Sequence, residues 1–157
     1  MLGRNTSSEV GNAGAGGYPS TPVDVTGLTS GVSSVASGNS HSCVVTSSGG
    51  VKCWGSNSSG QLGDNSLTNR STPVDVSGLS SGVTAISLGN AYSCALTSAG
   101  GVKCWGHATY GQIGNGTFVD RKTPVDVSGL TTGVSSIATG TWHACALMTA
   151  GTVRCWG

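Results

Sequence analysis

Charged and aromatic residues are scarce in this sequence. Of its 157 residues, 8% are charged and 5% are aromatic, whereas about 25% of the residues in ordinary soluble domains are charged. Long solvated helices need Lys, Glu and Arg on their outer faces, so this composition excludes a mainly helical fold. The seven Lys and Arg residues are scattered and the formal net charge is +1, which argues against nucleic-acid binding through a basic patch.

Long apolar runs are lacking as well. No stretch approaches the roughly 20 apolar residues that span a bilayer, so we expect no membrane insertion. The first ten residues, Met1–Val10, do not contain the apolar core of a signal peptide. If the protein is exported, its signal was removed, lies elsewhere or is of another kind.

Glycine, serine and threonine take the place of the missing charges. The chain contains 27 Gly residues, more than double the usual share of about 7%. Frequent Gly, Ser, Thr and Asn suit tight turns between short strands. We therefore expect an all-β protein.

The sequence repeats itself with a period of 51 residues. Thr21–Trp54 and Thr72–Trp105 share 22 of 34 residues without a gap. A fixed period of this size is typical of propellers, solenoids and repeat arrays. We expect a single array over residues 1–157, with units of approximately 2–54, 55–105 and 106–157, each carrying the motif Thr-Pro-Val-Asp-Val.

Each unit contains four short stretches that are typical of strands. In the middle copy these are 73–76, which opens with Pro as an edge strand does; 83–88, rich in β-branched residues; and a hairpin of 93–97 and 102–105. Four antiparallel strands are the content of one propeller blade. Propellers close with about 4–8 blades, so three units are not expected to form a closed ring alone.

Pairing within the hairpin predicts disulfides. Placing Cys94 opposite Cys104 puts Leu96 opposite Val102, which gives one continuous apolar face and brings the two Cβ atoms close to disulfide reach. Six buried free thiols are the alternative. Disulfides would place the protein outside a reducing cytosol. The expected pairs are Cys43–Cys53, Cys94–Cys104 and Cys145–Cys155.

A metal site is not expected from the same residues. Nine residues separate the cysteines of each pair, whereas a zinc knuckle has about two to four. His41 and His143 precede two of the pairs, but the middle copy has Tyr92 at that position, and tyrosine is no usual zinc ligand.

One segment resembles a known repeat. The sequence Cys53-Trp54-Gly55-Ser56-Asn57-Ser58-Ser59-Gly60-Gln61-Leu62-Gly63-Asp64, preceded by His41-Ser42-Cys43, is similar to the repeat of the regulator of chromosome condensation family, and residues 106–114 repeat it loosely. The resemblance covers nearly the whole chain and implies four-stranded blades, usually seven to a ring. The paired cysteines resemble the bacterial secreted and surface branch of that family.

The resemblance does not carry an activity with it. The founding members exchange guanine nucleotide on the Ran GTPase through loops, and this chain keeps its period without a loop insertion. The similar plant ultraviolet-B photoreceptor depends on a dense tryptophan cluster, whereas Trp142 is the only tryptophan outside the repeated position. A shared fold does not by itself transfer a function.

No set of residues indicates catalysis, so we expect no enzyme, no cofactor and no metal. Asp24, Asp75 and Asp126 recur in the same predicted strand of every unit, where we expect them to satisfy backbone groups at a strand end. A Ser-His-Asp triad is a spatial arrangement, and no motif points to one.

The aromatic residues fall into a repeated and a non-repeated set. Trp54, Trp105 and Trp156 are expected to pack between blades rather than to form a sugar-stacking platform. Tyr110, Phe118 and Trp142 are interpreted as a candidate binding patch, because two of them lie in the most divergent loop. Scattered surface aromatics are the alternative.

These observations favour a non-enzymatic extracellular or cell-surface module, which acts through self-assembly or as a binding scaffold. The expected partners are a second copy joined head to tail in a ring or filament, the missing blades of a longer chain, or a glycan or protein ligand. A GTPase regulator of the exchange-factor type and a secreted carbohydrate-binding propeller are the alternatives.

Overall fold

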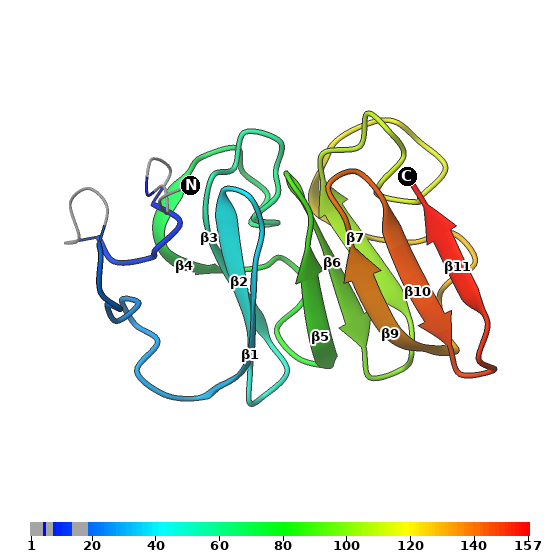
Figure 1. The fold of residues 1–157 in the computed structure, drawn as a ribbon, viewed down its shortest axis with the longest axis horizontal. Coiled ribbons are helices and arrows are strands. Elements are labelled where there is room, and N and C mark those ends of the chain that lie inside the picture. Colours follow the sequence, from blue (N-terminus) through cyan, green and yellow to red (C-terminus); the bar gives the residue numbers. More distant parts are fainter. Residues whose placement is uncertain (1–4, 6–7, 14–18) are drawn as a thin grey trace.

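Eleven antiparallel strands make up the fold in the computed structural model, which describes residues 5, 8–13 and 19–157 (Figure 1). These residues contain no helix, and therefore none long and apolar enough to cross a membrane. The expected all-β class is confirmed. The strands are β1 (Val32–Ser37), β2 (His41–Thr46), β3 (Val51–Gly55), β4 (Arg70–Asp75), β5 (Val83–Leu88), β6 (Tyr92–Thr97), β7 (Val102–Gly106), β8 (Arg121–Asp126), β9 (Val134–Thr139), β10 (Ala144–Met148) and β11 (Val153–Trp156).

The strands form three sheets, which we call blades 1, 2 and 3. Blade 1 has the strand order β1-β2-β3-β4, blade 2 has the order β5-β6-β7-β8, and blade 3 contains β9, β10 and β11. The first strands β1, β5 and β9 lie next to one another, and β4 and β8 form the opposite edges. Figure 1 shows the blades side by side without a closed ring, as the three sequence units predicted.

Each complete blade takes its strands from two successive sequence copies. β4 contains Thr72-Pro73-Val74-Asp75 of the second copy, but it pairs with β3 of the first, Cys53 facing Val74. The prediction that the four strands of one sequence unit form one blade is therefore wrong, because the fourth strand of a blade comes from the next unit. The edge position of Pro73 is confirmed. Residues 21–25 carry the same motif and form no strand, and the described residues before them contain no hairpin with which they could pair.

The hairpin register agrees with the prediction in all three blades. Cys94 lies opposite Cys104 and Leu96 opposite Val102, and the other two hairpins repeat this pairing. Each hairpin turns through a glycine with a positive φ, such as Gly100 at 76°, where a residue with a side chain would be strained. The same turn in each copy fixes the same register.

The hydrophobic core lies between blades. One cluster of buried side chains joins Cys43 and Val51 of blade 1 to Trp105 of blade 2. A second cluster joins Val102 of blade 2 to Ala144 of blade 3. The face that carries the cysteines in one blade is thus covered by the next blade along the chain.

The two outer faces of the array expose residues that are buried elsewhere in it. Val153 of blade 3 is 63% exposed, whereas its counterpart Val102 in blade 2 is 0% exposed. At the other end, Val35 of blade 1 is 68% exposed and its counterpart Ile86 is 8% exposed. The outer face of blade 3 and the β1 part of the outer face of blade 1 therefore expose apolar residues of the kind that pack between blades, whereas Val44 and Trp54 of blade 1 are buried.

Candidate functional site

The tryptophan of each Cys-Trp-Gly motif is built into the packing. Trp105 is fully buried between blades 1 and 2, and its Nε1 donates to the Gln61 carbonyl oxygen at 2.9 Å. A Cβ atom at Gly63 would lie 2.7 Å from that Nε1, so the indole fits here only because residue 63 is glycine. The same bond recurs from Trp54 to Glu9 at 2.7 Å and from Trp156 to Gln112 at 2.9 Å.

The three predicted cysteine pairs are joined as disulfides, and no cysteine is free. Cys43–Cys53 and Cys94–Cys104 are fully buried in the clusters between blades. Cys145–Cys155 lies on the open face of blade 3, where Cys155 is exposed. The described part of the chain has no group of His, Cys, Asp and Glu that could hold a metal ion.

A buried histidine links blades 1 and 2. The Ser93 hydroxyl donates to the Gln61 carbonyl oxygen at 2.8 Å, so its oxygen accepts the proton of His41 Nε2 at 2.9 Å. His41 Nδ1 has no hydrogen-bond partner within the described residues. Burial of the ring lowers the pKa of His41 from 6.5 to about 4. Since Ser93 is 0% exposed, this Ser–His contact holds the two blades together and offers no accessible nucleophile.

The buried histidine predicts an acid-sensitive fold. Because the unfolded chain binds a proton on His41 near pH 6.5 and the folded chain only near pH 4, folding is disfavoured as pH falls through this window. We expect about 2 kcal/mol of stability to be lost between pH 7 and pH 5. Urea denaturation at the two pH values measures it.

Two variants separate this histidine from the others. His41→Gln keeps an N–H donor but cannot titrate, so the loss between pH 7 and pH 5 should shrink to a few tenths of a kcal/mol. His143→Gln is the matched control, because His143 occupies the same position in blade 3 and is exposed. An unchanged pH dependence in His41→Gln would show that another group causes it.

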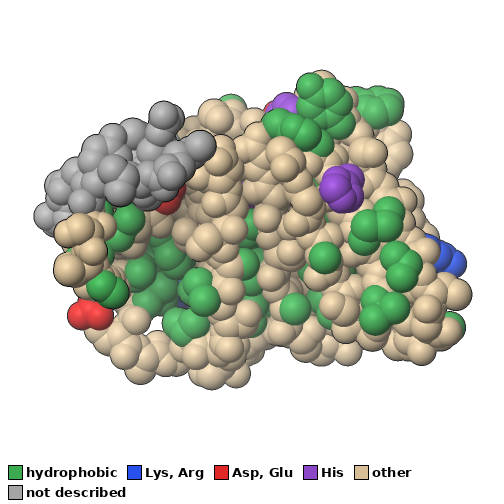
Figure 2. Space-filling model, in the orientation of Figure 1, with side chains coloured by type: hydrophobic (Ala, Val, Ile, Leu, Met, Phe, Trp, Pro, Cys, Tyr) green, Lys and Arg blue, Asp and Glu red, His purple; other side chains and the backbone are tan. Residues whose placement is uncertain are grey.

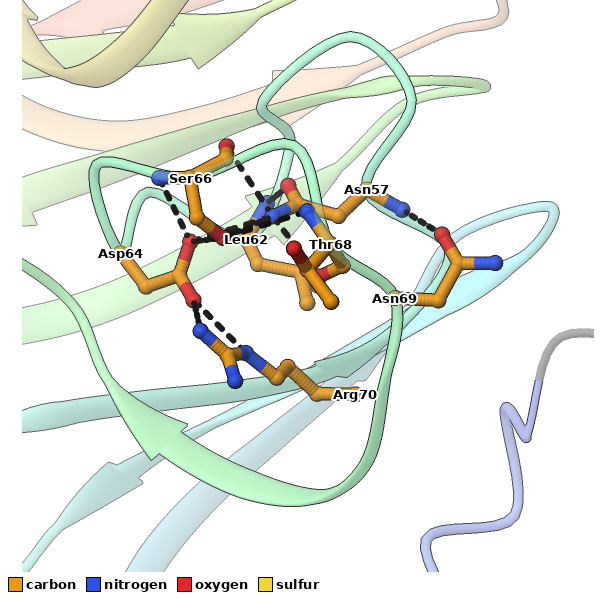
Figure 3. A network of polar contacts seen from close by, with 7 residues as sticks. All are labelled: Asn57, Leu62, Asp64, Ser66, Thr68, Asn69 and Arg70. Atoms are coloured by element: carbon orange, nitrogen blue, oxygen red, sulfur yellow. Dashed lines mark hydrogen bonds and ion pairs between the residues drawn. The ribbon is translucent and has the colours of Figure 1, made fainter.

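A network of polar contacts fixes the loop between β3 and β4 (Figure 3). Asp64 accepts hydrogen bonds from the Ser66 hydroxyl at 2.7 Å and Asn57 Nδ2 at 3.1 Å, and it pairs with Arg70 at 2.8 Å. Burial acts to raise the pKa of Asp64, but hydrogen bonds from Ser66, Arg70 and Asn57 outweigh it and lower the pKa. These side chains are engaged with one another, so the network stabilises the loop.

Two of the three repeated aspartates form ion pairs, rather than the backbone contacts that were predicted for them. Asp75 pairs with Lys52 at 2.6 Å and Asp126 with Lys103 at 2.7 Å, each across neighbouring strands. Asp24 lies outside any strand, because its segment has no partner strand in the described residues. Ion pairs this exposed contribute little stability but favour one register between the two strands.

Two of the three residues predicted as a binding patch come together. The rings of Tyr110 and Trp142 have centroids 5.4 Å apart and planes at 61°. His107, which the sequence did not single out, lies 5.7 Å from Trp142 and 6.2 Å from Tyr110. We call these three residues the aromatic junction, because they join the β7–β8 loop of blade 2 to the β9–β10 turn of blade 3.

The third predicted residue stands apart from the aromatic junction. Phe118 is 72% exposed and lies beside Gly111 of the same loop, and it makes no ring contact within the described chain. In Figure 2, hydrophobic side chains gather beside a histidine on the rim over the β7–β8 loop. The predicted patch is therefore a cluster of Tyr110 and Trp142 with His107, and Phe118 borders it.

A hollow lies where the first strands of the blades end. Its volume is about 530 Å³. The sequence did not single it out, although the Gly-Asn or Gly-Thr pair in each copy marks the position. The lining includes Gly38-Asn39, Gly89-Asn90 and Gly140-Thr141.

Four-stranded antiparallel sheets that pack face to face define a segment of a β-propeller. The regulator of chromosome condensation (RCC1) repeat matches residues 48–96 and 99–147, and a second form of this repeat matches residues 32–61 and 83–112. These matches cover more than half of the sequence. The chain belongs to the RCC1 repeat family.

Curated relatives are much longer than this chain. The mitochondrial RCC1 domain-containing protein RUG3 of Arabidopsis thaliana is 33% identical over 144 residues, which are 90% of this chain and 32% of RUG3. The human probable E3 ubiquitin-protein ligase HERC3 is 36% identical over 116 residues, 73% of this chain and 11% of HERC3. The chain thus spans less than a third of these relatives.

Solved structures share the fold. Human WBSCR16 superimposes with a TM-score of 0.86 at 25% identity, over 99% of this chain and 41% of that protein. Prp20p of Saccharomyces cerevisiae has a TM-score of 0.81 at 20% identity, over 99% of this chain and 40% of Prp20p. The three blades therefore correspond to a partial propeller.

Proposed function

We propose that this chain is a non-enzymatic binding scaffold of an oxidising compartment, outside the cell or at its surface. Its blades are completed by further blades of the same design, which come from a second copy or from more repeats of one polypeptide. The observation that carries this proposal is the pair of apolar end faces, with Val153 63% exposed at one end and Val35 68% exposed at the other.

The two end faces are complementary. Inside the array, the face of blade 2 with Val102 packs on blade 3, and the face of blade 2 with Ile86 packs on blade 1. Val153 and Val35 occupy these two positions in the outer blades. A second copy placed head to tail would therefore reproduce a contact that the chain already makes twice, giving a ring of six blades or an open filament.

The edge of blade 3 also accepts a strand. Among the described residues, β11 has no partner on its outer side, where β4 and β8 complete the other blades. Residues 19–24 correspond to β4 and form no strand. Added to β11 of a neighbouring copy, they would set Asp24 beside Arg154, the counterpart of Lys52 and Lys103 in the two existing ion pairs.

The three disulfides support the proposed compartment. Buried Cys43–Cys53 and Cys94–Cys104 form under oxidising conditions and are rare in a reducing cytosol. RUG3, by contrast, is named as a mitochondrial protein. For this chain the cysteine pairs favour an extracellular or surface location.

A protein-binding regulator is the second candidate. A study of Prp20p names its binding to Gsp1p and histones, which makes a protein ligand a reasonable alternative for a propeller of this family. The disulfides count against a cytosolic exchange factor. Loss of folding on mild reduction would speak against the regulator.

Light scattering during size-exclusion chromatography tests the assembly. At tens of micromolar, we expect the 157-residue chain to form a dimer or larger species, because each copy would otherwise leave exposed apolar residues at both ends in water. Val153→Lys and Val35→Lys should each shift it toward monomer, since both side chains are exposed in the single chain. Mass should rise with protein concentration.

The control keeps the new charge away from the end faces. Leu67 is a 56% exposed residue of the β3–β4 loop, so Leu67→Lys should assemble like the parent. A folded, monodisperse monomer of the parent chain at this concentration would refute self-assembly. Equal loss of assembly in Leu67→Lys would show that the end faces are not its cause.

A further inference from the structure

The contact between blades 1 and 2 can be compared directly with the contact between blades 2 and 3, where the aromatic junction lies. Blades 1 and 2 meet through the same framework as blades 2 and 3, with a buried cluster at each contact. The rings are therefore not needed to hold two blades together, and their gathering at one place requires another reason. In the reference position, Ser56, Ser59 and Ala91 stand where His107, Tyr110 and Trp142 stand 51 residues later.

The loop beneath the rings is held firmly. Gln112 is fully buried; its Oε1 accepts the Tyr110 backbone N–H at 2.8 Å, and its Nε2 donates to His107 Nδ1 at 2.9 Å. His107 Nε2 must then carry the proton, which it donates to Thr109 Oγ1 at 3.0 Å. The Thr109 hydroxyl hydrogen consequently points away from this contact and is left to donate to a ligand.

The aromatic junction presents neutral polar groups that have no partner. Trp142 Nε1 and Tyr110 Oη form no hydrogen bond within the described chain, and the two residues are 38% and 58% exposed. By contrast, the other three indoles each donate to a backbone carbonyl, and the Tyr92 hydroxyl donates to the carbonyl oxygens of Gly140 and His143. In the aromatic junction, two aromatic side chains of the described residues thus keep a polar atom that is free to bind a ligand.

A hollow of about 380 Å³ is lined by Tyr110, Trp142, His143 and Gly157. This volume is within the range of small-ligand pockets, about 300–1,000 Å³. The Tyr110 and Trp142 planes meet at 61°, so they form two walls rather than one flat platform. None of the three side chains carries a fixed positive charge, which disfavours a phosphate group as the ligand.

From this geometry we infer that the aromatic junction binds a neutral saccharide, with a pyranose ring against Tyr110 and Trp142. A pyranose offers apolar C–H faces for the two rings and hydroxyl groups for Trp142 Nε1, Tyr110 Oη and Thr109 Oγ1. A protein partner would favour a broader apolar surface, and Phe118 stands outside the ring cluster. The inference rests on the binding-scaffold part of the proposed function and does not require ring closure.

The test uses nuclear magnetic resonance of the ¹⁵N-labelled 157-residue chain. Cellohexaose, chitohexaose and mannohexaose are titrated separately, and the indole N–H signals of the four tryptophans are followed. We expect at least one hexasaccharide to shift the Trp142 signal saturably. The signals of Trp54, Trp105 and Trp156 should stay in place, because their indole N–H groups are already bonded to backbone carbonyls.

The matched variant gives the junction the residues of its reference position. His107→Ser, Tyr110→Ser and Trp142→Ala together should weaken binding by about tenfold or more, read from the backbone signals of Ala108 and Thr109. The fold should survive, because the chain already uses Ser56, Ser59 and Ala91 in the same framework. Phe118→Ser, in the same loop but outside the ring cluster, should bind as the parent does.

Three results would overturn the inference. One is no saturable shift with any of the three hexasaccharides at millimolar concentration. Another is undiminished affinity in the triple variant. The third is a Trp142 shift with decaproline while all saccharides are inert, which would make the junction a peptide-binding surface. A monomeric chain that binds a hexasaccharide would refute self-assembly alone, so the two proposals fail separately.

Discussion

Replacing Trp105 with alanine should lower the free energy of unfolding by about 3–5 kcal/mol. The indole is fully buried between blades 1 and 2, and its Nε1 bonds to the Gln61 carbonyl at 2.9 Å. Truncation would leave a cavity in the first cluster and remove one of the two donors to the Gln61 carbonyl, the other being the Ser93 hydroxyl. Urea denaturation at pH 7, followed by far-ultraviolet circular dichroism, measures the loss.

Alanine substitutions of two other tryptophans serve as comparisons for Trp105→Ala. Trp156 has the same place in the motif but is only partly buried on blade 3, so Trp156→Ala should cost less than Trp105→Ala. Trp142→Ala removes an indole of the aromatic junction that is 38% exposed and has no hydrogen bond, and it should cost less than about 1 kcal/mol. A loss below about 1 kcal/mol for Trp105→Ala would mean that its ring is not part of the core.

Loss of the Cys94–Cys104 disulfide should cost about 3 kcal/mol or more. The two cysteines are 10 residues apart, and closing a loop of this size in the unfolded chain accounts for about 3 kcal/mol in the chain-entropy description. The sulfur atoms are also buried between blades 2 and 3, so the Cys94→Ala, Cys104→Ala double variant loses packing as well. Thermal and urea denaturation of the double variant would quantify it.

The third disulfide is the natural control, because it closes a loop of equal length on an exposed face. The Cys145→Ala, Cys155→Ala double variant should lose only the stability that loop closure contributes. Its free energy of unfolding should therefore fall by about 1 kcal/mol less than that of the variant without the buried pair. Equal losses would show that burial of Cys94 and Cys104 adds nothing. Mass mapping of the unreduced parent should recover each hairpin pair, and a Cys53–Cys94 species would contradict the register.

The hairpins could be predicted because they are local. Cys94 and Cys104 are joined by a short turn, so alternation of apolar residues and turn glycines is enough to fix the register. The fourth strand is different, since 14 residues separate Gly55 of β3 from Arg70 of β4. Nothing in the alternation of residues 72–76 tells which hairpin they will pair with, and the blade phase was therefore predicted wrongly.

The aromatic junction shows a second limit of sequence patterns. Tyr110 and Trp142 are 32 residues apart, and only the packing of blade 3 on blade 2 brings their rings together. The unrepeated aromatic residues could be recognised as a set, but their convergence could not. His107 was overlooked because a single histidine in a loop gives no periodic signal, although it differs from its counterpart Ser56 in the preceding copy.

β4 belongs to the second sequence copy but completes the blade of the first, so blade boundaries and repeat boundaries differ. This difference determines where the gene could be cut without breaking a sheet. A break between Asp75 and Val83 falls between two finished sheets, whereas a break after Trp54, at the boundary of the sequence repeat, strips β4 from blade 1. Deletion or duplication of a 51-residue segment that starts near Ser77 would remove or add one whole blade. The chain can thus lengthen or shorten by recombination in steps of one blade, provided that each crossover falls in the connection between sheets.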